Sequence, residues 1–300
     1  MIARVYSTSI PMKTLLFFAI ASLCSSAFGA QSSAASNPQA TPPQIVEVHS
    51  GPLNLKAYFW KPTGQGPYPA VLFNHGSGAG DAQHTAGQTM AEAAANLAPV
   101  FLRHGYAFFY LCRRGQGLSA DQAPFMQNLL QREESADGKE ARQHLQYKLV
   151  TTDHLDDALA GLLVLKSVHG VDPKRIAIVG HSFGGVITLL SGERDSTIRA
   201  EITFGAGANS WKASEELRRR VFAAVGKTSA PIMLIHAAND YDTTPGIAIS
   251  AELDRLHKGH VLKIYPSLGK SSDDGHNLLY LAIPEWEPDV FQFLDTNVKP

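Results

Sequence analysis

Short apolar runs recur along the chain beyond residue 69, and each has the length of a buried strand. Because successive positions are apolar, both faces of each predicted strand should be covered. The runs are residues 70–73, 107–111, 176–179, 202–204, 232–235 and 261–265. Segments with helical periodicity lie between or after them, at residues 152–168, 186–191, 214–224, 247–257 and 285–296. This alternation predicts a mostly parallel, doubly wound α/β sheet in three layers.

Two more strands are expected ahead of this pattern. Residues 45–48 and 53–60 are rich in strand-forming side chains and flank the turn residues Ser50, Gly51 and Pro52. We expect them to form an antiparallel edge at the N-terminal side of the sheet.

One segment breaks the alternation of strands and helices. The segment of residues 118–147 is long, polar and mixed in charge. It contains one small apolar cluster, formed by Pro124, Phe125, Met126, Leu129 and Leu130. Connections of this length in compact domains are usually functional or mobile. Because it follows a strand's carboxyl end, we expect this insertion to lie over any site at that edge.

The first thirty residues have the pattern of a secretory signal peptide. Arg4 and Lys13 precede an apolar run at residues 15–23, and small residues follow, so cleavage is expected between Ala27 and Ala30. The run is shorter than the roughly 20 residues that span a membrane. Export to the periplasm or the medium, without stable membrane insertion, is therefore predicted. A lipoprotein anchored at Cys24 is the alternative, but Leu23 stands where a small residue would be expected.

Composition describes an ordinary globular protein. Residues 31–43 are rich in Ser, Ala, Gln and Pro and predict a flexible linker, which leaves residues 44–300 as a single domain. With 44% hydrophobic residues and a net charge of −1, nothing favours nucleic acid as a partner. After leader removal Cys112 is the remaining cysteine, so no internal disulfide is expected. The sequence carries no signal of oligomeric state.

The strongest chemical motif is Gly180-His181-Ser182-Phe183-Gly184, which stands between a predicted strand and a predicted helix. This is the context of a nucleophile elbow, where Ser182 occupies a strained turn and the flanking glycines avoid clashes. The bland alternative is a helix cap in a glycine-rich turn.

A serine nucleophile needs a base and an acid, which follow it in the chain order Ser, Asp, His. Asp240 and His276 each come after a later predicted strand, where the topology brings loops together. Asp242 is the competitor for the acid, since either aspartate could instead begin the turn before Pro245. Asp273 and Asp274, on the loop of His276, are expected to be solvated turn residues.

Five motifs along the chain occur together in one known superfamily. They are Phe73-Asn74-His75-Gly76-Ser77-Gly78, Arg113-Arg114-Gly115-Gln116-Gly117, the elbow, Asn239-Asp240-Tyr241 and Gly275-His276. On these motifs the chain from about residue 69 onward resembles the α/β-hydrolase superfamily. It looks most like dienelactone hydrolase-type and acetyl-esterase-type members, which are related to the catalytic domains of prolyl oligopeptidase-like peptidases. Ser182 stands where true dienelactone hydrolases carry a cysteine, which favours serine-esterase chemistry.

The resemblance implies an oxyanion hole made of the backbone amides of Ser77 and Phe183. We also consider Phe125 and Arg114 as candidates for contact with the substrate. Arg113 and Arg114 could each contact a substrate carboxylate or carbonyl, but the pattern favours ion-paired loop residues for both. No cofactor is implied. No metal is expected either, since a glycine and a strand start separate His257 from His260.

The leading interpretation is a carboxylesterase acting on small or medium esters through a Ser-His-Asp acyl-enzyme mechanism. One alternative is a serine peptidase of the prolyl oligopeptidase kind, although only about forty residues separate the leader from the first core strand. Another is a non-catalytic binding protein that keeps the fold, for which an incomplete triad would be expected.

Overall fold

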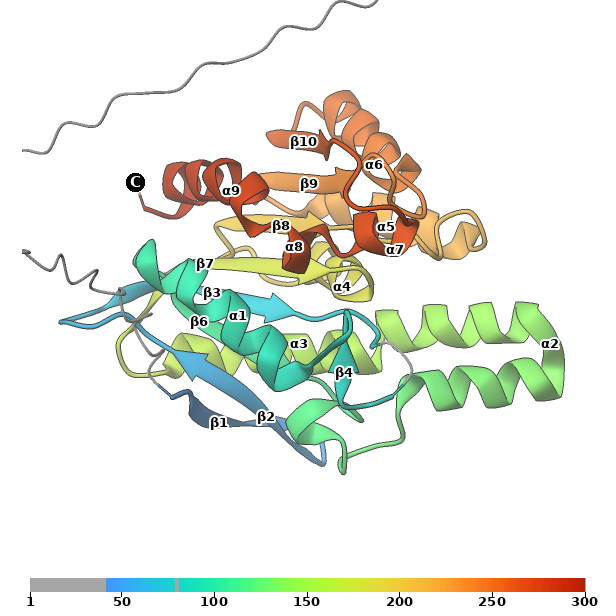
Figure 1. The fold of residues 1–300 in the computed structure, drawn as a ribbon, viewed down its shortest axis with the longest axis horizontal. Coiled ribbons are helices and arrows are strands. Elements are labelled where there is room, and N and C mark those ends of the chain that lie inside the picture. Colours follow the sequence, from blue (N-terminus) through green and yellow to red (C-terminus); the bar gives the residue numbers. More distant parts are fainter. Residues whose placement is uncertain (1–41, 79–80, 300) are drawn as a thin grey trace, which may run out of the picture. The chain divides into compact units, whose positions relative to one another are not determined.

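The predicted strands assemble into one sheet of eight strands in the computed structural model (Figure 1). The structure describes residues 42–78 and 81–299, so the predicted leader and the linker up to residue 41 lie outside it. Within these residues the order is β1-β2-β6-β3-β7-β8-β9-β10. The strands are β1 (Gln44–Ser50), β2 (Leu53–Trp60), β3 (Tyr68–Asn74), β6 (Ala107–Cys112), β7 (Val171–His181), β8 (Ala200–Phe204), β9 (Ile232–Ala237) and β10 (His260–Tyr265), with β4 (His84–Thr85) and β5 (Gln88–Thr89) forming a separate short ladder.

The direction of pairing matches the expectation from sequence. β1 pairs with β2, and β2 with β6, in antiparallel fashion, whereas all pairs from β6 through β10 are parallel. β6, β8 and β9 are buried at every position, as their apolar runs predicted. The mostly parallel sheet with an antiparallel N-terminal edge is therefore confirmed.

Helices cover both faces of the sheet and complete the predicted three layers (Figure 1). Helices α1 (Met90–Arg103), α8 (Leu278–Leu281) and α9 (Ile283–Val298) pack on one face around Phe73, Phe108 and Trp286. The other face is covered by α3 (Asp153–Ser167), α4 (Phe183–Gly192), α5 (Glu215–Lys227) and α6 (Thr244–Arg255). A short α7 (Ser272–His276) precedes α8.

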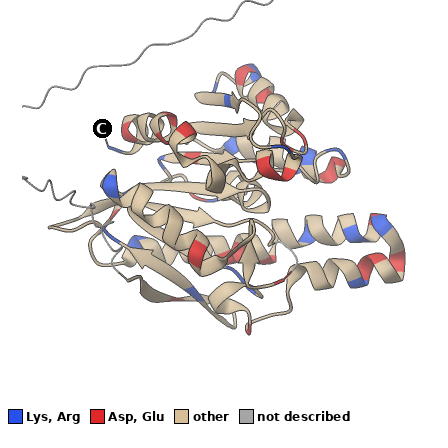
Figure 2. Ribbon diagram, viewed as in Figure 1, with Lys and Arg blue, Asp and Glu red and all other residues tan. Residues whose placement is uncertain are grey.

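Among the longer helices, α1 and α2 were absent from the sequence-based prediction, as were the short α7 and α8. Helix α1 contains Pro99 in its interior, and a proline at such a position normally argues against a helix in a sequence-based assignment. Residues 118–147 hold most of α2 (Met126–Thr151), which Gly138 (φ 86°, ψ −176°) divides into two arms that lie side by side (Figure 1). Only the base of this hairpin has buried apolar residues, and its arms carry both charge signs (Figure 2). That distribution explains why no helical periodicity was detected.

The strand order places a functional crevice at one edge of the sheet. From β3 the chain crosses outward to β6, and from β7 it continues in the opposite direction through β8, β9 and β10. The loops that follow β3 and β7 therefore diverge at a topological switch point, where α/β proteins commonly bind ligands. Among the described residues no helix combines the length and the apolar character that crossing a bilayer requires.

Glu201, on β8, is a carboxylic acid side chain buried within the protein core. It is fully buried and accepts a hydrogen bond from the Thr228 hydroxyl at 2.6 Å. Burial raises the pKa of Glu201 from 4.5 to about 8, and the bond from Thr228 offsets only part of this. The folded protein thus holds a proton that the unfolded chain releases, so this group's contribution to stability falls as pH rises from about 5 to 8.

Replacing Glu201 with Gln keeps the shape and the acceptor for Thr228 but removes the titration. The wild type should lose stability between pH 5 and pH 8, whereas Glu201→Gln should not lose it through this group. The Tm of the variant minus the Tm of wild type should therefore increase by on the order of 5 °C from pH 5 to pH 8, since 1 kcal/mol shifts Tm by roughly 2–4 °C for a protein of this size. Thermal unfolding at both pH values measures this difference. The exposed Glu140→Gln is the control, and a Glu201→Gln difference as constant as the control's would contradict the prediction.

Candidate active site

Ser182 occupies a strained turn between β7 and α4. Its backbone has φ 54° and ψ −117°, a left-handed conformation that side chains disfavour. A Cβ on Gly180 would lie 2.2 Å from the carbonyl oxygen of Gly184, and one on Gly184 would lie 2.0 Å from that of Asn74. Both glycines are therefore required for the close approach of α4 to β7 and to the end of β3.

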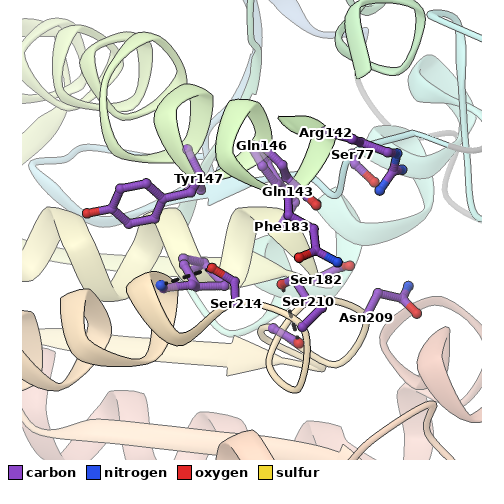
Figure 3. A pocket seen from close by; sticks show the side chains of 15 residues that line it. Ser77, Arg142, Gln143, Gln146, Tyr147, Ser182, Phe183, Asn209, Ser210 and Ser214 are labelled. Carbon is purple, nitrogen blue, oxygen red and sulfur yellow. Dashed lines mark hydrogen bonds between the residues drawn. The ribbon is translucent and has the colours of Figure 1, made fainter. Parts of the chain in front are cut away.

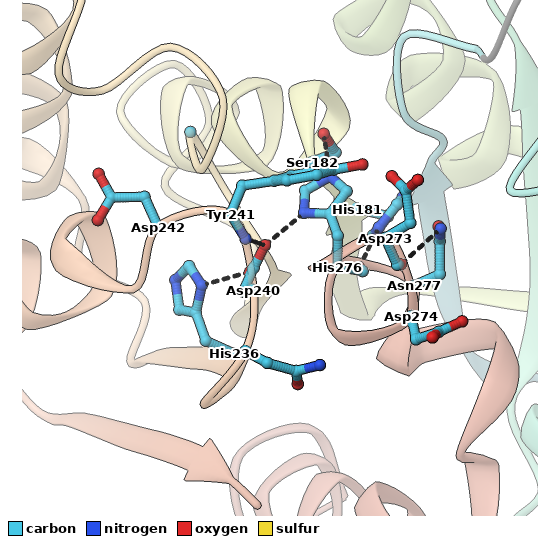
Figure 4. A network of polar contacts seen from close by, with 12 residues as sticks. His181, Ser182, His236, Asp240, Tyr241, Asp242, Asp273, Asp274, His276 and Asn277 are labelled. Carbon is cyan, nitrogen blue, oxygen red and sulfur yellow. Dashed lines mark hydrogen bonds and ion pairs between the residues drawn. The ribbon is translucent and has the colours of Figure 1, made fainter. Parts of the chain in front are cut away.

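The three residues expected to form a relay lie together (Figure 4). His276 Nε2 is 2.8 Å from Ser182 Oγ, and His276 Nδ1 is 2.7 Å from Asp240 Oδ1. With the Nδ1 proton donated to the carboxylate, Nε2 is free to accept the proton of the serine hydroxyl. His276 and Asp240 are nearly buried, so the relay is shielded from bulk water.

Asp240 is held by a second histidine that the sequence analysis did not single out. His236 Nδ1 donates to Asp240 Oδ2 at 2.7 Å, and the Tyr241 amide donates to Oδ1 at 2.8 Å. Burial raises the pKa of Asp240, but the hydrogen bonds from His236 and His276 outweigh it and hold the pKa below its usual value. The carboxylate therefore stays ionised. The available signal was a histidine at the end of β9, four residues before the acid.

The competing acids have other partners. Asp242 Oδ1 accepts a hydrogen bond from the Thr244 amide at 3.0 Å at the start of α6. Asp274 accepts from the Ser271 amide and hydroxyl and caps α7. Asp273 lines the cavity beside His276. The geometry thus favours Asp240 over Asp242 as the partner of His276.

His181 supports the loop that carries His276. It is buried, and its Nε2 donates to the His276 carbonyl oxygen at 2.9 Å. Burial lowers the pKa of His181 to about 3, so the ring is neutral at ordinary pH.

The predicted oxyanion donors lie on either side of Ser182. Phe183 is the first residue of α4, and the loop after β3 comes so close that a Cβ on Gly76 would lie 3.6 Å from the Ser182 Cβ. Ser77, next in that loop, lines the same cavities as Ser182. Two amides from separate elements are thus available beside one hydroxyl.

Two cavities meet at Ser182. One, of about 140 Å³, lies under the second arm of α2, whose Arg142, Gln143, Gln146 and Tyr147 line it together with Phe183, Asn209, Ser210 and Ser214 (Figure 3). The other, of about 130 Å³, lies on the side of His276 and is bounded by Tyr241 and Asn277. Sequence reasoning missed the α2 side chains because nothing in a polar helix marks the residues that face a cavity.

Among protein-family models, that of the dienelactone hydrolase family matches residues 55–271, well over half of the chain. The chain belongs to the dienelactone hydrolase family. The resemblance inferred from the sequence motifs is thereby confirmed. No curated protein matches the sequence.

Solved structures with the same architecture include peptidases and an esterase. Acylaminoacyl peptidase from Pyrococcus horikoshii has a TM-score of 0.59 at 19% identity, over 86% of this chain and 42% of that one. Dipeptidyl peptidase 4 from Porphyromonas gingivalis has a TM-score of 0.60 at 18% identity, over 86% and 36%. Est1E from Butyrivibrio proteoclasticus, solved with ferulic acid bound, has a TM-score of 0.59 at 16% identity, over 85% and 100%.

This family member spans less than half the length of the two peptidases. At such low identities the similarity shows the fold alone, which is the α/β-hydrolase fold. Family membership, together with the hydrogen-bonded Ser182 and His276, supports a serine hydrolase in general terms.

The two candidates for contact with the substrate lie elsewhere in this dienelactone hydrolase family member. Arg114 donates to both carboxylate oxygens of buried Asp157, at 2.8 and 2.9 Å, and lines neither cavity. Phe125 packs behind the loop after β3, where its Cζ would be 3.2 Å from a Cβ on Gly78. Arg114 is thus ion-paired, as the pattern favoured, and Phe125 backs the loop instead of facing a ligand.

Within the described ranges, no group of three His, Cys, Asp or Glu side chains is arranged to hold a metal ion. His260 contacts Ser250 and the Lys258 carbonyl.

Cys112 is a packing residue, because its side chain is completely buried in the core. The same burial raises the pKa of its thiol to about 12.

A pair of matched amide substitutions tests the assignment of the acid. Asp240→Asn removes the charge that orients and stabilises the His276 imidazolium, and we expect kcat to fall by on the order of 10³–10⁴. Asp242→Asn keeps the acceptor for the Thr244 amide and should change kcat by less than about threefold. Steady-state kinetics on a p-nitrophenyl ester gives both values, and a reversed order of effects would refute the assignment.

Proposed function

We propose that the chain is an exported serine carboxylesterase that cleaves small or medium esters through a Ser182–His276–Asp240 relay. The observation that carries the proposal is the continuous hydrogen-bonded path from Ser182 Oγ through both nitrogens of His276 to Asp240, at 2.8 and 2.7 Å, where two cavities meet. The predicted leader at residues 1–30 motivates export.

Acylation begins as Ser182 Oγ attacks the ester carbonyl carbon and its proton passes to His276 Nε2. The carbonyl electron pair moves to oxygen, and the amides of Ser77 and Phe183 donate to the resulting oxyanion. Asp240 stabilises the imidazolium that forms. The intermediate then collapses, and the departing alkoxide takes the proton from Nε2 and leaves as the alcohol.

Deacylation repeats these steps with water as the nucleophile. His276 Nε2 accepts a proton from water as its oxygen attacks the acyl carbon of the acyl-enzyme. A second oxyanion forms in the same place, the bond to Ser182 Oγ breaks, and the serine recovers its proton from His276. No cofactor takes part in this proposed scheme.

The two cavities suit the two halves of an ester. Because His276 must protonate the leaving alcohol, we assign the cavity of about 130 Å³ beside His276 to the alcohol portion. The cavity of about 140 Å³ beneath α2 then receives the acyl portion. Its apolar floor of Phe183, Val186 and Leu217 and its polar wall of amides and hydroxyls fit a compact acyl group with a polar substituent.

A peptidase is the second candidate, because two of the structural relatives are named as peptidases. Enzymes that bind a free peptide amino terminus need a carboxylate to pair with the ammonium group. The charged residue that lines the acyl cavity is Arg142, and no described Asp or Glu lines it. This charge favours an ester, or an N-blocked amide, over a peptide with a free amino terminus.

A fluorophosphonate probe tests the nucleophile, and a substrate panel tests its use. The wild type should be labelled at Ser182, since the relay activates that hydroxyl, and Ser182→Ala should lose labelling by more than about 10³-fold. Mass spectrometry of the labelled peptide provides the measurement. In the panel, kcat/KM for p-nitrophenyl acetate and butyrate should exceed that for dipeptidyl and acyl-aminoacyl p-nitroanilides by at least about tenfold.

Equal labelling of the wild type and Ser182→Ala would contradict the proposed nucleophile. Faster release from the p-nitroanilides would favour the peptidase instead.

The intact mass of the labelled protein recovered from its native host tests export. Cleavage near Ala30 would shorten the chain, whereas full-length protein starting at Met1 would contradict export.

A further inference from the structure

Three side chains hold consecutive carbonyl groups in the loop after β3. Arg113 Nη2 donates to the His75 carbonyl at 2.6 Å and to that of Gly76 at 3.1 Å. His75 Nδ1 donates to the same Gly76 oxygen at 2.7 Å, and Gln116 Nε2 donates to the Ser77 carbonyl at 3.1 Å. In the loop that supplies one expected oxyanion amide, every carbonyl oxygen from residue 75 to 77 thus accepts a side-chain hydrogen bond.

Two of these hydrogen bonds act on the peptide unit between Gly76 and Ser77. The Gly76 carbonyl and the Ser77 amide belong to the same trans peptide, so they point in opposite directions. Hydrogen bonds to the carbonyl oxygen fix the orientation of the amide and polarise it, which makes the N–H a stronger donor. Arg113 and His75 therefore aim and strengthen the Ser77 donor without lining either cavity.

Arg113 is an unusual residue to find in this place. Its side chain is completely buried, and burial lowers the pKa of the guanidinium to about 10, which leaves it charged at neutral pH. Among the described residues it forms no ion pair, since neighbouring Asp157 bonds to Arg114. Nε and Nη1 likewise have no hydrogen-bond partner among the described atoms. Burying an ion without a direct counterion is costly.

The position of this charge gives a reason for the cost. The guanidinium carbon lies 5.8 Å from the ring centre of Phe183, the residue whose amide is the second expected donor. The cation therefore lies against the loop that carries Ser77 and beside the Phe183 side chain, close to the two residues whose amides are expected to hold the negative charge of the transition state. Fixed charges in a water-excluded site stabilise such a charge without needing to reorganise.

We propose that Arg113 is a positioning residue for the oxyanion hole, acting with His75 and Gln116 as a buried clamp that stabilises the transition state and not the bound substrate. The inference rests on the proposed serine-hydrolase function and adds a source of its rate enhancement.

The test compares Arg113→Met, which has a similar length without the charge or donors, with Arg113→Lys, which keeps the charge. Arg220→Met is the matched control, because Arg220 forms a two-bond ion pair with Glu193 away from both cavities. Each variant is measured for kcat and KM on p-nitrophenyl acetate, for inhibition by a trifluoromethyl ketone that adds reversibly to the serine, and for Tm.

Arg113→Met should lower kcat by about 10–100-fold and leave KM within about twofold, because the lost interaction operates in the transition state. The inhibition constant of the ketone should rise by a similar factor, and Arg113→Lys should recover part of both losses. Arg220→Met should lower Tm with little change in kcat. An unchanged kcat in folded Arg113→Met, or a loss confined to KM, would overturn the proposal.

Gln116→Met keeps the proposal testable even if Arg113→Met does not fold. It removes only the contact with the Ser77 carbonyl and should lower kcat by about threefold to tenfold without raising KM. No effect on kcat would again count against the clamp. Fluorophosphonate labelling separates the two proposals: a wild type that is not labelled refutes the serine hydrolase itself, whereas equal labelling rates in wild type and Arg113→Met refute only the clamp.

Discussion

The backbone at Ser182 is the constraint on which the rest of the site depends. A serine at φ 54° is tolerated only because β7 and α4 close on it from both sides. That closure requires the absence of side chains at Gly180 and Gly184, and it brings α4 against the end of β3. One strained residue therefore fixes the hydroxyl, the Phe183 amide and the distance to the loop of Ser77 together.

Charges around this turn are distributed as the proposed reaction would require. Asp240 lies behind His276, where positive charge would develop, and its two histidine partners keep the carboxylate ionised. Arg113 lies against the loop that carries Ser77, one of the two expected oxyanion donors, and near the ring of Phe183, which carries the other. Both groups are buried, so their fields are weakly screened. In the proposed reaction, positive charge would form on His276 near the negative Asp240, and negative charge would form on the substrate oxygen on the side of the positive Arg113.

Sequence patterns predicted the parts of this structure that local chemistry determines. Apolar runs located β3 and the strands from β6 to β10, and the glycine spacing around Ser182 located the turn. Asp240 could not be separated from Asp242 by spacing, because the choice depends on which oxygen reaches His276. The helical arms of α2 were missed, since their buried apolar residues lie only at the base of the hairpin and the arms have no apolar stripe. His236 and Arg113 act through contacts that only the assembled fold creates.

The most direct test of this account is a crystal structure of the protein after reaction with a fluorophosphonate. The account predicts a bond from phosphorus to Ser182 Oγ, with the phosphoryl oxygen roughly 2.7–3.1 Å from the amide nitrogens of both Ser77 and Phe183. His276 should remain bonded to Asp240. A phosphoryl oxygen turned away from both amides, or phosphorus attached to another residue, would contradict the account.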